Sequence, residues 1–313
     1  MAEPILEAES LISGVSANYE LPPITGCELI RRGFNDHYLV KAKDQQYVLR
    51  LYLNNKYYIS GADDFRFELE LLSFLKAREV PVAHPIVRQD GELLGRIETP
   101  DGIRYSALFH FAKGEEFERY AEKTPTMAKQ LGELIGRLHL NADDFNSGYN
   151  RYHLDFRYLI DEPIRILEKH LVERGKGDLA FFKPLVGQLK QCVSQLPTES
   201  TYGIIHADLH GRNIFYDDEA GFCFFDFDHC AYGWRVYEFV TFSHLPDDIR
   251  AALYEGYESI RPLSKLEKEL MPVFRKLRTI WDLGDILSMY AVWGGGPEDD
   301  YLEECVSRLQ NMM

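Results

Sequence analysis

The sequence predicts an α+β fold in two parts, with an antiparallel sheet in the first part and mainly helices in the second. Short runs rich in β-branched and aromatic residues occur between Cys27 and Phe111, and apolar residues repeat at helical spacing after Thr124. The chain has 313 residues, of which 45% are hydrophobic and 13% aromatic. This length and this composition are sufficient for two lobes with substantial cores.

The first third of the chain alternates between strand and helix patterns. An amphipathic helix is expected over residues 4–17, and a second helix over 63–78 with Asp63 or Asp64 as its N-cap. Strands are expected where β-formers cluster, at residues 28–30, 38–40, 47–52, 92–97 and 105–111.

One charged residue of the second helix needs a partner. At 100° per residue, Glu68 falls in the middle of the apolar face that includes Phe65 and Leu72. An unpaired buried carboxylate costs several kcal/mol. Arg50, an isolated cation inside an apolar strand, is therefore expected to pair with Glu68.

The second part of the chain has helical periodicity. Thr124 and Pro125 form a cap followed by a proline at the first helical position, and further helices are expected over residues 154–174, 178–196 and 263–289. A glycine-rich breaker at 294–297 precedes an acidic final helix.

The stretch from His206 to Asp228 combines a hairpin pattern with many polar side chains. β-Formers at 214–216 and 222–225 flank a polar, glycine-ending turn at 217–221. In an antiparallel hairpin the start of the first strand lies beside the end of the second. Asn213 is therefore expected opposite Asp226, within about two residues of register. The segment 229–238 is expected to be a loop that leads into a helix.

These residues form a candidate oxygen cluster at one end of the hairpin: Asp208, Asn213, Asp226 and Asp228. A few hard oxygen ligands suit Mg²⁺, which usually shares its coordination shell with waters and phosphates. A carboxylate that does not bind the metal can accept a proton from an attacking hydroxyl. The combination is typical of phosphoryl transfer.

The H-x-D-x-x-x-x-N motif from His206 to Asn213, followed by Asp226 and Asp228, resembles a known family. It is similar to the phosphotransferase enzyme family of aminoglycoside phosphotransferases, choline kinases and homoserine kinases, in the protein-kinase-like superfamily. The resemblance implies that Asp208 orients the acceptor hydroxyl as a base, that Asn213 and Asp226 hold Mg²⁺, and that His206 braces the loop.

The resemblance also implies how the chain is divided. It implies a protein-kinase-like two-lobed fold, with a nucleotide-covering lobe over 1–109 and a helical catalytic and acceptor-binding lobe over 110–313. The segment from Phe109 to Phe111 would be the hinge, whose backbone contacts the adenine. Family members commonly have Asp where Glu238 stands, where it supports the catalytic loop.

Two features depart from the pattern of the family. The pair made by Arg50 and Glu68 is usually Lys and Glu, with the cation also reaching the nucleotide phosphates. The phosphate-covering loop would contain Gly33, yet the chain has one glycine there and no GxGxxG. A glycine alone at this place is more often part of a hairpin or bulge than a phosphate contact.

The implied reaction is ATP- and Mg²⁺-dependent transfer of the γ-phosphoryl group to a hydroxyl of a small molecule. Aminoglycosides, amino alcohols, homoserine-like compounds and sugars are all open as acceptors. By resemblance, the acceptor pocket is faced by side chains of the long helix: Arg278, Trp281, Asp282 and Asp285.

Three alternatives stay open at the level of sequence. A protein Ser/Thr kinase would use the same residues. A nucleotide-binding module without catalysis would be expected to lack the complete set of acidic and amide residues. A zinc-dependent hydrolase would use a different set of ligands: His206, Asp208, His210, His229 and Cys230.

Composition limits the partners and the compartment. Fifty acidic and 35 basic residues give a net charge of −15, which argues against nucleic acid as the partner. The five cysteines form no CxxC pair, as expected of reduced thiols. No signal-peptide pattern and no apolar run of membrane-spanning length occur. A cytoplasmic protein without a membrane or nucleic-acid partner is expected, and its oligomeric state is not defined by the sequence.

Overall fold

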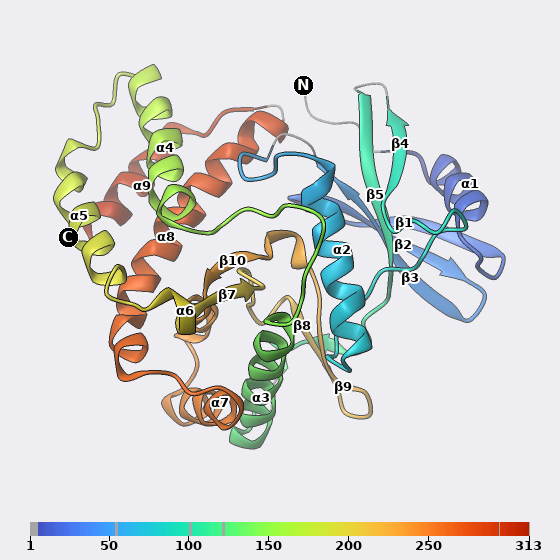
Figure 1. Cartoon of the computed structure of the whole chain (residues 1–313). Helices are drawn as coiled ribbons and strands as arrows, with labels where there is room; N and C mark the ends of the chain where they lie inside the picture. Colours follow the sequence, from blue (N-terminus) through green and yellow to red (C-terminus); the bar gives the residue numbers. More distant parts are fainter. Residues whose placement is uncertain (1–5, 54–55, 100–101, 121–122, 294, 313) are drawn as a thin grey trace.

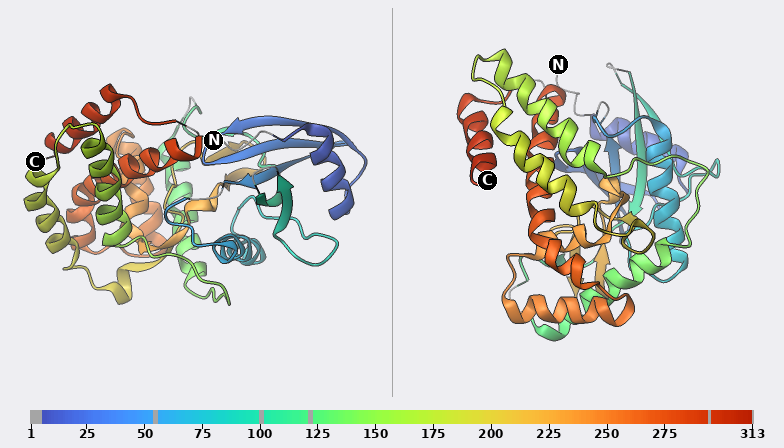
Figure 2. Two further views of the ribbon diagram at one scale, coloured as in Figure 1. Left: turned by 90° about the horizontal axis from the view of Figure 1, so that it is seen from above. Right: turned by 60° about the vertical axis from the view of Figure 1, so that its left-hand side comes forward.

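The computed structural model describes residues 6–53, 56–99, 102–120, 123–293 and 295–312. A five-stranded antiparallel sheet lies on one side of the molecule and most helices on the other, with α2 between them (Figure 1). The left view of Figure 2 shows the same separation from above. The predicted α+β class is confirmed.

The sheet is formed by consecutive parts of the chain. Its order is β1-β2-β3-β5-β4, and all neighbours pair antiparallel. The strands are β1 (Ile24–Arg32), β2 (Asn35–Ala42), β3 (Gln45–Tyr52), β4 (Gly95–Thr99) and β5 (Gly102–His110). The strands predicted in this region are all present. β1, β2 and β3 are longer than predicted, whereas β4 begins at Gly95 and not at residue 92, and β5 ends at His110 and not at Phe111.

Two helices cover the two faces of this sheet. Leu49 and Leu51 of β3 pack in a cluster with α1 (Ala8–Asn18), whereas Tyr52 packs in another cluster with α2 (Ala62–Ala77). Side chains alternate between faces along a strand, so Arg50 points to the α2 side. The strand period thus directs Arg50 toward Glu68.

The start of α2 differs from the prediction. Neither Asp63 nor Asp64 is the N-cap; that position is Gly61. Asp64 lies in the first turn, and its Oδ2 accepts hydrogen bonds from the backbone N–H groups of Ser60 at 2.8 Å and Gly61 at 3.3 Å. A carboxylate in the first turn can reach back to these N–H groups and also interacts favourably with the helix dipole. The first predicted helix begins at Ala8, and its predicted start at residue 4 lies outside the described residues.

Helices form most of the remaining structure. They are α3 (Pro125–Ala142), α4 (Glu162–Glu173), α5 (Lys183–Val193), α6 (Thr198–Thr201), α7 (Asp247–Ile260), α8 (Lys265–Trp293) and α9 (Asp299–Gln310). The predicted cap of α3 is confirmed, since Thr124 Oγ1 accepts a hydrogen bond from Met127 N at 3.2 Å. Gly132 allows α3 to approach α7 closely, because a Cβ there would lie 2.0 Å from the carbonyl oxygen of Leu253.

Short strands complete the centre of the molecule. The predicted hairpin is confirmed as β8 (Ile214–Asp217) and β9 (Gly221–Phe224), and β6 (Glu115–Glu116) pairs with β8. β7 (Tyr202–Ile205) pairs with β10 (Ala231–Trp234). The segment 229–238 was predicted as a loop that leads into a helix. A 3-10 helix does follow at Arg235–Phe242, but the predicted loop contains β10, because pairing with a strand about 30 residues earlier is not visible in local sequence.

One core continues from the sheet into the helical part. A single cluster of buried side chains joins Phe109 of β5, Leu72 of α2, Leu131 of α3 and Phe224 of β9. β5 ends at His110, next to the predicted lobe boundary between residues 109 and 110, which stays a prediction. Among the described residues, none of the helices has the length and apolar character needed to cross a bilayer.

Candidate active site

Glu238 stabilises the loop that follows β7 through hydrogen bonds to the backbone of the loop. Glu238 Oε1 accepts hydrogen bonds from the backbone N–H of His206 at 2.5 Å and of Ala207 at 3.4 Å. Ala207 has a φ of 66°, so the chain turns sharply at this point. Glu238 therefore occupies the supporting position that the resemblance assigned to it.

Replacement of Glu238 tests this support. Glu238→Ala leaves two buried N–H groups without an acceptor, and we expect the free energy of unfolding to fall by about 2 kcal/mol. Glu238→Gln keeps an acceptor oxygen and should lose less than half as much. Chemical denaturation of both variants measures the difference. Equal losses would show that the acceptor oxygen is not what stabilises the loop.

His206 connects this loop to the end of the hairpin. Its Nδ1 accepts a hydrogen bond from Asp208 N at 3.3 Å, so the proton resides on Nε2, which donates to the carbonyl oxygen of Phe225 at 2.9 Å. The side chain is fully buried. Both ring nitrogens thus form hydrogen bonds that hold the loop in place. His206 therefore has no free nitrogen with which to bind zinc, as the zinc-dependent hydrolase would require.

Asp208 forms an ion pair with Arg278. Arg278 Nη2 donates to its Oδ1 at 2.6 Å, and Asn213 Nδ2 donates to its Oδ2 at 3.0 Å. Burial would raise the pKa of Asp208, but the charge of Arg278 and a hydrogen bond from His210 hold this pKa well below its usual range. Asp208 is therefore a carboxylate at neutral pH, able to accept a hydrogen bond from a hydroxyl.

Asn213 and Asp226 meet at the end of the hairpin. Ile214 pairs with Phe224, and Phe225 N donates to the carbonyl oxygen of Asn213 at 3.1 Å, so Asp226 is one residue beyond the position opposite Asn213. The predicted register is confirmed. Asp226 has a φ of 64°, a left-handed conformation that is uncommon outside glycine.

The free oxygens of these two residues fit a divalent cation. Asn213 Oδ1 and Asp226 Oδ1 are both buried without a hydrogen-bond partner, although Arg50 Nη2 lies 3.1 Å from Asp226 Oδ1. In the described part of the chain, no three His, Cys, Asp or Glu side chains are grouped to hold a metal. A site with few protein ligands suits Mg²⁺ that arrives with phosphates and keeps several waters.

Asp228 points to a different set of partners. Its Oδ2 accepts hydrogen bonds from Asn35 Nδ2 at 2.7 Å and from Lys56 Nζ at 2.9 Å, and all three side chains are buried. Asn35 and Lys56 were missed by the sequence analysis, because they are far from residue 228 in the chain and belong to no motif. The role of Asp228 as a metal ligand stays a prediction.

The predicted pair between β3 and α2 is present. Arg50 Nη1 donates to Glu68 Oε1 at 2.6 Å, and Tyr52 Oη donates to Glu68 Oε2 at 3.1 Å. The side chains of Arg50 and Glu68 are 5% and 0% exposed. Burial raises the pKa of Glu68, and the charge of Arg50 opposes this rise. Arg50 thus connects Glu68 to Asp226.

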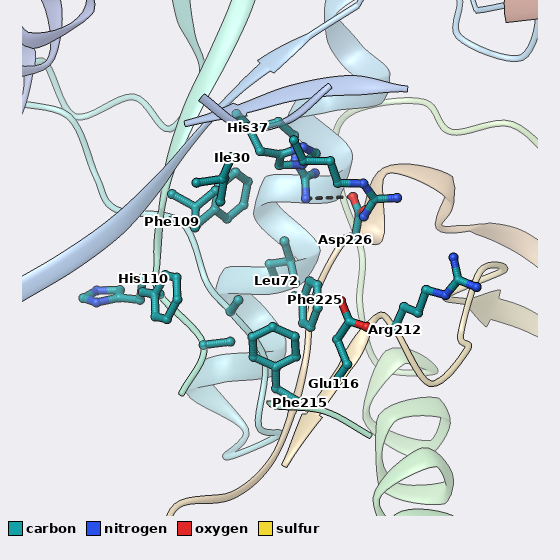
Figure 3. Close-up of a pocket in the computed structure, with 16 residues that line it drawn as sticks. Ile30, His37, Leu72, Phe109, His110, Glu116, Arg212, Phe215, Phe225 and Asp226 are labelled. Carbon is teal, nitrogen blue, oxygen red and sulfur yellow. Dashed lines mark ion pairs between the residues drawn. The ribbon is translucent and has the colours of Figure 1, made fainter. Parts of the chain in front are cut away.

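A cavity of about 250 Å³ lies between the sheet and the hairpin. Figure 3 shows Ile30 and Phe109 on one side of it and Phe215 and Phe225 on the other. The predicted nucleotide residues Arg50, Phe109 and Phe111 line this cavity, as does Asp226. Flat apolar walls with charged groups at one end suit a ligand that has an aromatic base and an anionic tail.

Gly33 does not line the cavity. Its carbonyl oxygen accepts a hydrogen bond from Trp293 Nε1 at 3.2 Å, at the end of α8. Arg31, near the end of β1, does line the cavity, and its Nη1 lies 3.7 Å from Asp226 Oδ2. No local pattern in the sequence distinguished Arg31 from other surface arginines. The phosphate contact predicted for Gly33 stays a prediction.

A second, small cavity lies between the predicted catalytic Asp208 and two predicted metal ligands. It is bordered by Asp208, Asp226 and Asp228 together with Asn35 and His229. Asp226 borders both cavities. The structure thus places three of the four predicted oxygen-bearing residues around one space at the end of the aromatic cavity, and the fourth, Asn213, is hydrogen-bonded to Asp208.

The chain matches one family profile, and it is similar to proteins of several organisms. The sequence profile described as "Phosphotransferase enzyme family" matches residues 26–261. An uncharacterized protein of Synechocystis sp. is 32% identical over 286 residues, covering 88% of this chain and 77% of the relative. Homoserine kinase of Brucella anthropi is 28% identical over 276 residues, covering 82% of this chain and 77% of the relative.

Two solved structures have the same fold. A microcompartment-associated aminopropanol kinase matches with a TM-score of 0.74 and 21% identity, covering 97% of this chain and 95% of that chain. The amicoumacin kinase hAmiN, solved with AMP-PNP, Ca²⁺ and Ami, matches with a TM-score of 0.75 and 19% identity, covering 97% and 92%. The predicted protein-kinase-like fold is thereby confirmed.

Proposed function

Since the chain belongs to the phosphotransferase enzyme family, we propose that it transfers the γ-phosphoryl group of ATP, as the Mg²⁺ complex, to a hydroxyl of a small molecule. The observation that carries this proposal is the meeting of Asp208, Asn213 and Asp226 at one end of the aromatic cavity. Names of similar proteins support a small acceptor, because they include homoserine kinase and aminopropanol kinase.

The cavity supports the nucleotide part of the proposal. The base would lie between the apolar side chains of the sheet and those of the hairpin, near the backbone of Phe109 to Phe111. The guanidinium groups of Arg50 and Arg31 stand at the end where Asp226 lies, and they would balance phosphate charge. We also propose the lobe boundary at residues 109 and 110, which would allow closure over the nucleotide.

The oxygens of Asn213 and Asp226 would hold Mg²⁺. When bound with the nucleotide, the ion supplies positive charge that stabilises the developing charge on the phosphoryl oxygens. Asn213 Oδ1 is buried without a hydrogen-bond donor, and Asp226 Oδ1 has only the guanidinium of Arg50 beside it, so both oxygens could accept a cation. Asp228, two residues after Asp226, would be a further ligand of the ion. Its Oδ2 already accepts a hydrogen bond from Lys56.

Asp208 would bind and orient the acceptor hydroxyl. Its low pKa makes it a weak base toward a free alcohol. In a loose phosphoryl-transfer transition state, however, little proton transfer is needed before the bond to phosphorus forms. The main contribution of Asp208 would therefore be positioning, with the proton accepted late.

Isothermal titration with ATP tests the proposal. We expect wild-type protein to bind ATP with Mg²⁺ at least about tenfold more tightly than with EDTA, because the ion links phosphate to the protein. Asp226→Asn should remove most of this dependence on Mg²⁺. Asp218→Asn, in the exposed hairpin turn, is the matched control and should behave as wild type. Absence of ATP binding in wild-type protein would refute the proposed function.

We also propose that the protein is cytoplasmic. All five cysteines are free thiols, two of them buried. Reduced thiols and the use of ATP are both expected of a cytoplasmic enzyme.

A further inference from the structure

A further cavity lies outside the active site, between η4 (Arg235–Phe242), α7 and the first turns of α8. Figure 1 shows α7 below the beginning of α8. The volume of this cavity is about 280 Å³, similar to that of the aromatic cavity. We call it the basic cavity, because Arg250, Lys268 and Arg275 line it. None of the described residues that border it borders either cavity of the active site.

The charge of the basic cavity is opposite to that of the whole chain. Arg250 of α7 and Lys268 and Arg275 of α8 contribute three cationic side chains, and no carboxylate is among the described residues that line the space. The chain as a whole has a net charge of −15. A local concentration of positive charge beside a cavity attracts anions to that place.

Two of the three cations are held by neighbouring acidic groups. Arg250 Nη2 donates a hydrogen bond to Asp247. Lys268 Nζ forms an ion pair with Glu258. Arg275 is exposed, and within the described part of the chain no ion pair involves it. An anion in the basic cavity would therefore gain Arg275 as a partner without breaking an existing ion pair.

Two hydroxyl groups add hydrogen-bond donors. Ser243 and Tyr254 line the basic cavity. Burial raises the pKa of Tyr254, and the positive charges of Arg250 and Arg275 oppose this rise. Both guanidinium groups thus act on the tyrosine hydroxyl, which stays protonated at neutral pH. A protonated hydroxyl beside two guanidinium groups can donate to the same anion.

The remaining wall of the basic cavity is apolar. It is formed by Phe239 and Val240 of η4 and by Met271 and Pro272 of α8. The ring of Phe239 packs edge to face against that of Tyr254, with centroids 5.5 Å apart. An inorganic anion gains nothing from such a wall, whereas the hydrocarbon part of an organic anion can bury its surface there.

We propose that the basic cavity binds a small organic anion, in which a carboxylate or phosphate group is attached to an aliphatic or aromatic body. Arg275, Arg250 and the hydroxyl of Tyr254 would bind the anionic group, and Phe239 and Met271 would contact the body. This inference goes beyond the proposed function. It assigns a second ligand, separate from nucleotide and acceptor, to a site that shares no lining residue with the two cavities of the active site.

Calorimetric titration without ATP tests the inference with four probes: benzoate, phenyl phosphate, inorganic phosphate and benzyl alcohol. We expect the better of the two organic anions to bind at least about tenfold more tightly than benzyl alcohol, which brings no charge to Arg275. It should also bind more tightly than inorganic phosphate, which has no apolar part. The ranking of benzoate and phenyl phosphate identifies the preferred anionic group. If neither organic anion binds, or if benzyl alcohol or inorganic phosphate binds equally well, the inference is overturned.

Variants locate the bound anion. Arg275→Gln removes the unpaired cation and should weaken binding of the organic anion at least about tenfold. Ser243→Phe places a ring in the basic cavity from an exposed position, so it should weaken binding without a change of charge. Arg137→Gln, at an exposed position of α3, is the matched control and should bind as wild type. Equal melting temperatures would exclude unfolding, and unchanged binding in either Arg275→Gln or Ser243→Phe would overturn the inference.

Competition with ATP separates the basic cavity from the aromatic cavity, which could also accept an aromatic anion. Saturating ATP with Mg²⁺ should leave the affinity for the organic anion unchanged, because the two cavities share no lining residue. Displacement by ATP would place the anion in the aromatic cavity and would refute the inference. Failure of ATP binding in wild-type protein refutes the proposed function alone, since the titrations without ATP and the variants test the basic cavity independently.

Discussion

Asp208→Asn is expected to lower kcat for phosphoryl transfer by a factor of about 10³. Asparagine has nearly the same shape. Its oxygen can still accept the hydrogen bond from Arg278, whereas the hydrogen bond from Asn213 Nδ2 is lost. The bond to Arg278 should keep the loop in its conformation. It lacks the negative charge that attracts the acceptor hydroxyl, and it cannot take up the proton. Asp208 borders the small cavity and is not among the residues that line the larger one. The KM for ATP should therefore change by no more than about twofold.

A coupled assay of ADP formation measures both constants with the compound that gives the highest turnover in a screen of small hydroxylated molecules. Asp218→Asn controls for the loss of one acidic charge, because Asp218 lies in the exposed turn of the hairpin that follows the Asp208 loop. Equal melting temperatures of Asp208→Asn and wild type would exclude unfolding as the cause. A variant with more than half of the wild-type kcat would contradict the assigned role of Asp208.

The parts of the site that could be predicted from sequence depend on local geometry. The hairpin of β8 and β9 is defined by its turn, and the register of a hairpin brings Asn213 close to Asp226 without any tertiary information. Helical periodicity placed Glu68 on a buried face, and Arg50 was expected to pair with it because it is an isolated cation inside an apolar strand. Both inferences use only local patterns in the chain.

The parts that were missed depend on contacts between distant segments. Asn35 and Lys56 reach Asp228 across 193 and 172 residues, and neither lies in a periodic pattern. β10 consists of four residues and includes Gly233, so only its pairing with β7 identifies it as a strand. Tyr58 and Tyr152, which pack in one cluster with Trp281, come from segments that no local spacing could bring together.

The N-cap of α2 was missed for a different reason. Two acidic residues at the start of a helix can cap it or can reach back from the first turn, and both arrangements satisfy the same N–H groups. Tertiary packing selects between them. Asp64 is buried, with its Oδ1 4.0 Å from Arg151 Nη1, which favours the first-turn position.

Removal of one partner of the Arg50–Glu68 pair is expected to have the largest effect on stability. Arg50→Met leaves the buried carboxylate of Glu68 without its cation and should lower the free energy of unfolding by about 3 kcal/mol or more. It should also weaken binding of ATP with Mg²⁺ by at least about tenfold, because Arg50 lines the cavity beside Asp226. Denaturant unfolding and calorimetry measure the two effects separately.

The double variant Arg50→Met/Glu68→Met distinguishes the two roles of the arginine. A buried ion pair can be replaced by apolar side chains with little loss, so this variant should regain most of the stability lost in Arg50→Met. ATP binding should stay weak, because the cation beside Asp226 is still absent. If restoring stability also restored ATP binding, Arg50 would serve only to connect β3 to α2. Glu68 itself does not line the cavity. If Glu68→Met alone weakened ATP binding as strongly as Arg50→Met, ATP binding would depend mainly on the orientation that Glu68 gives to Arg50.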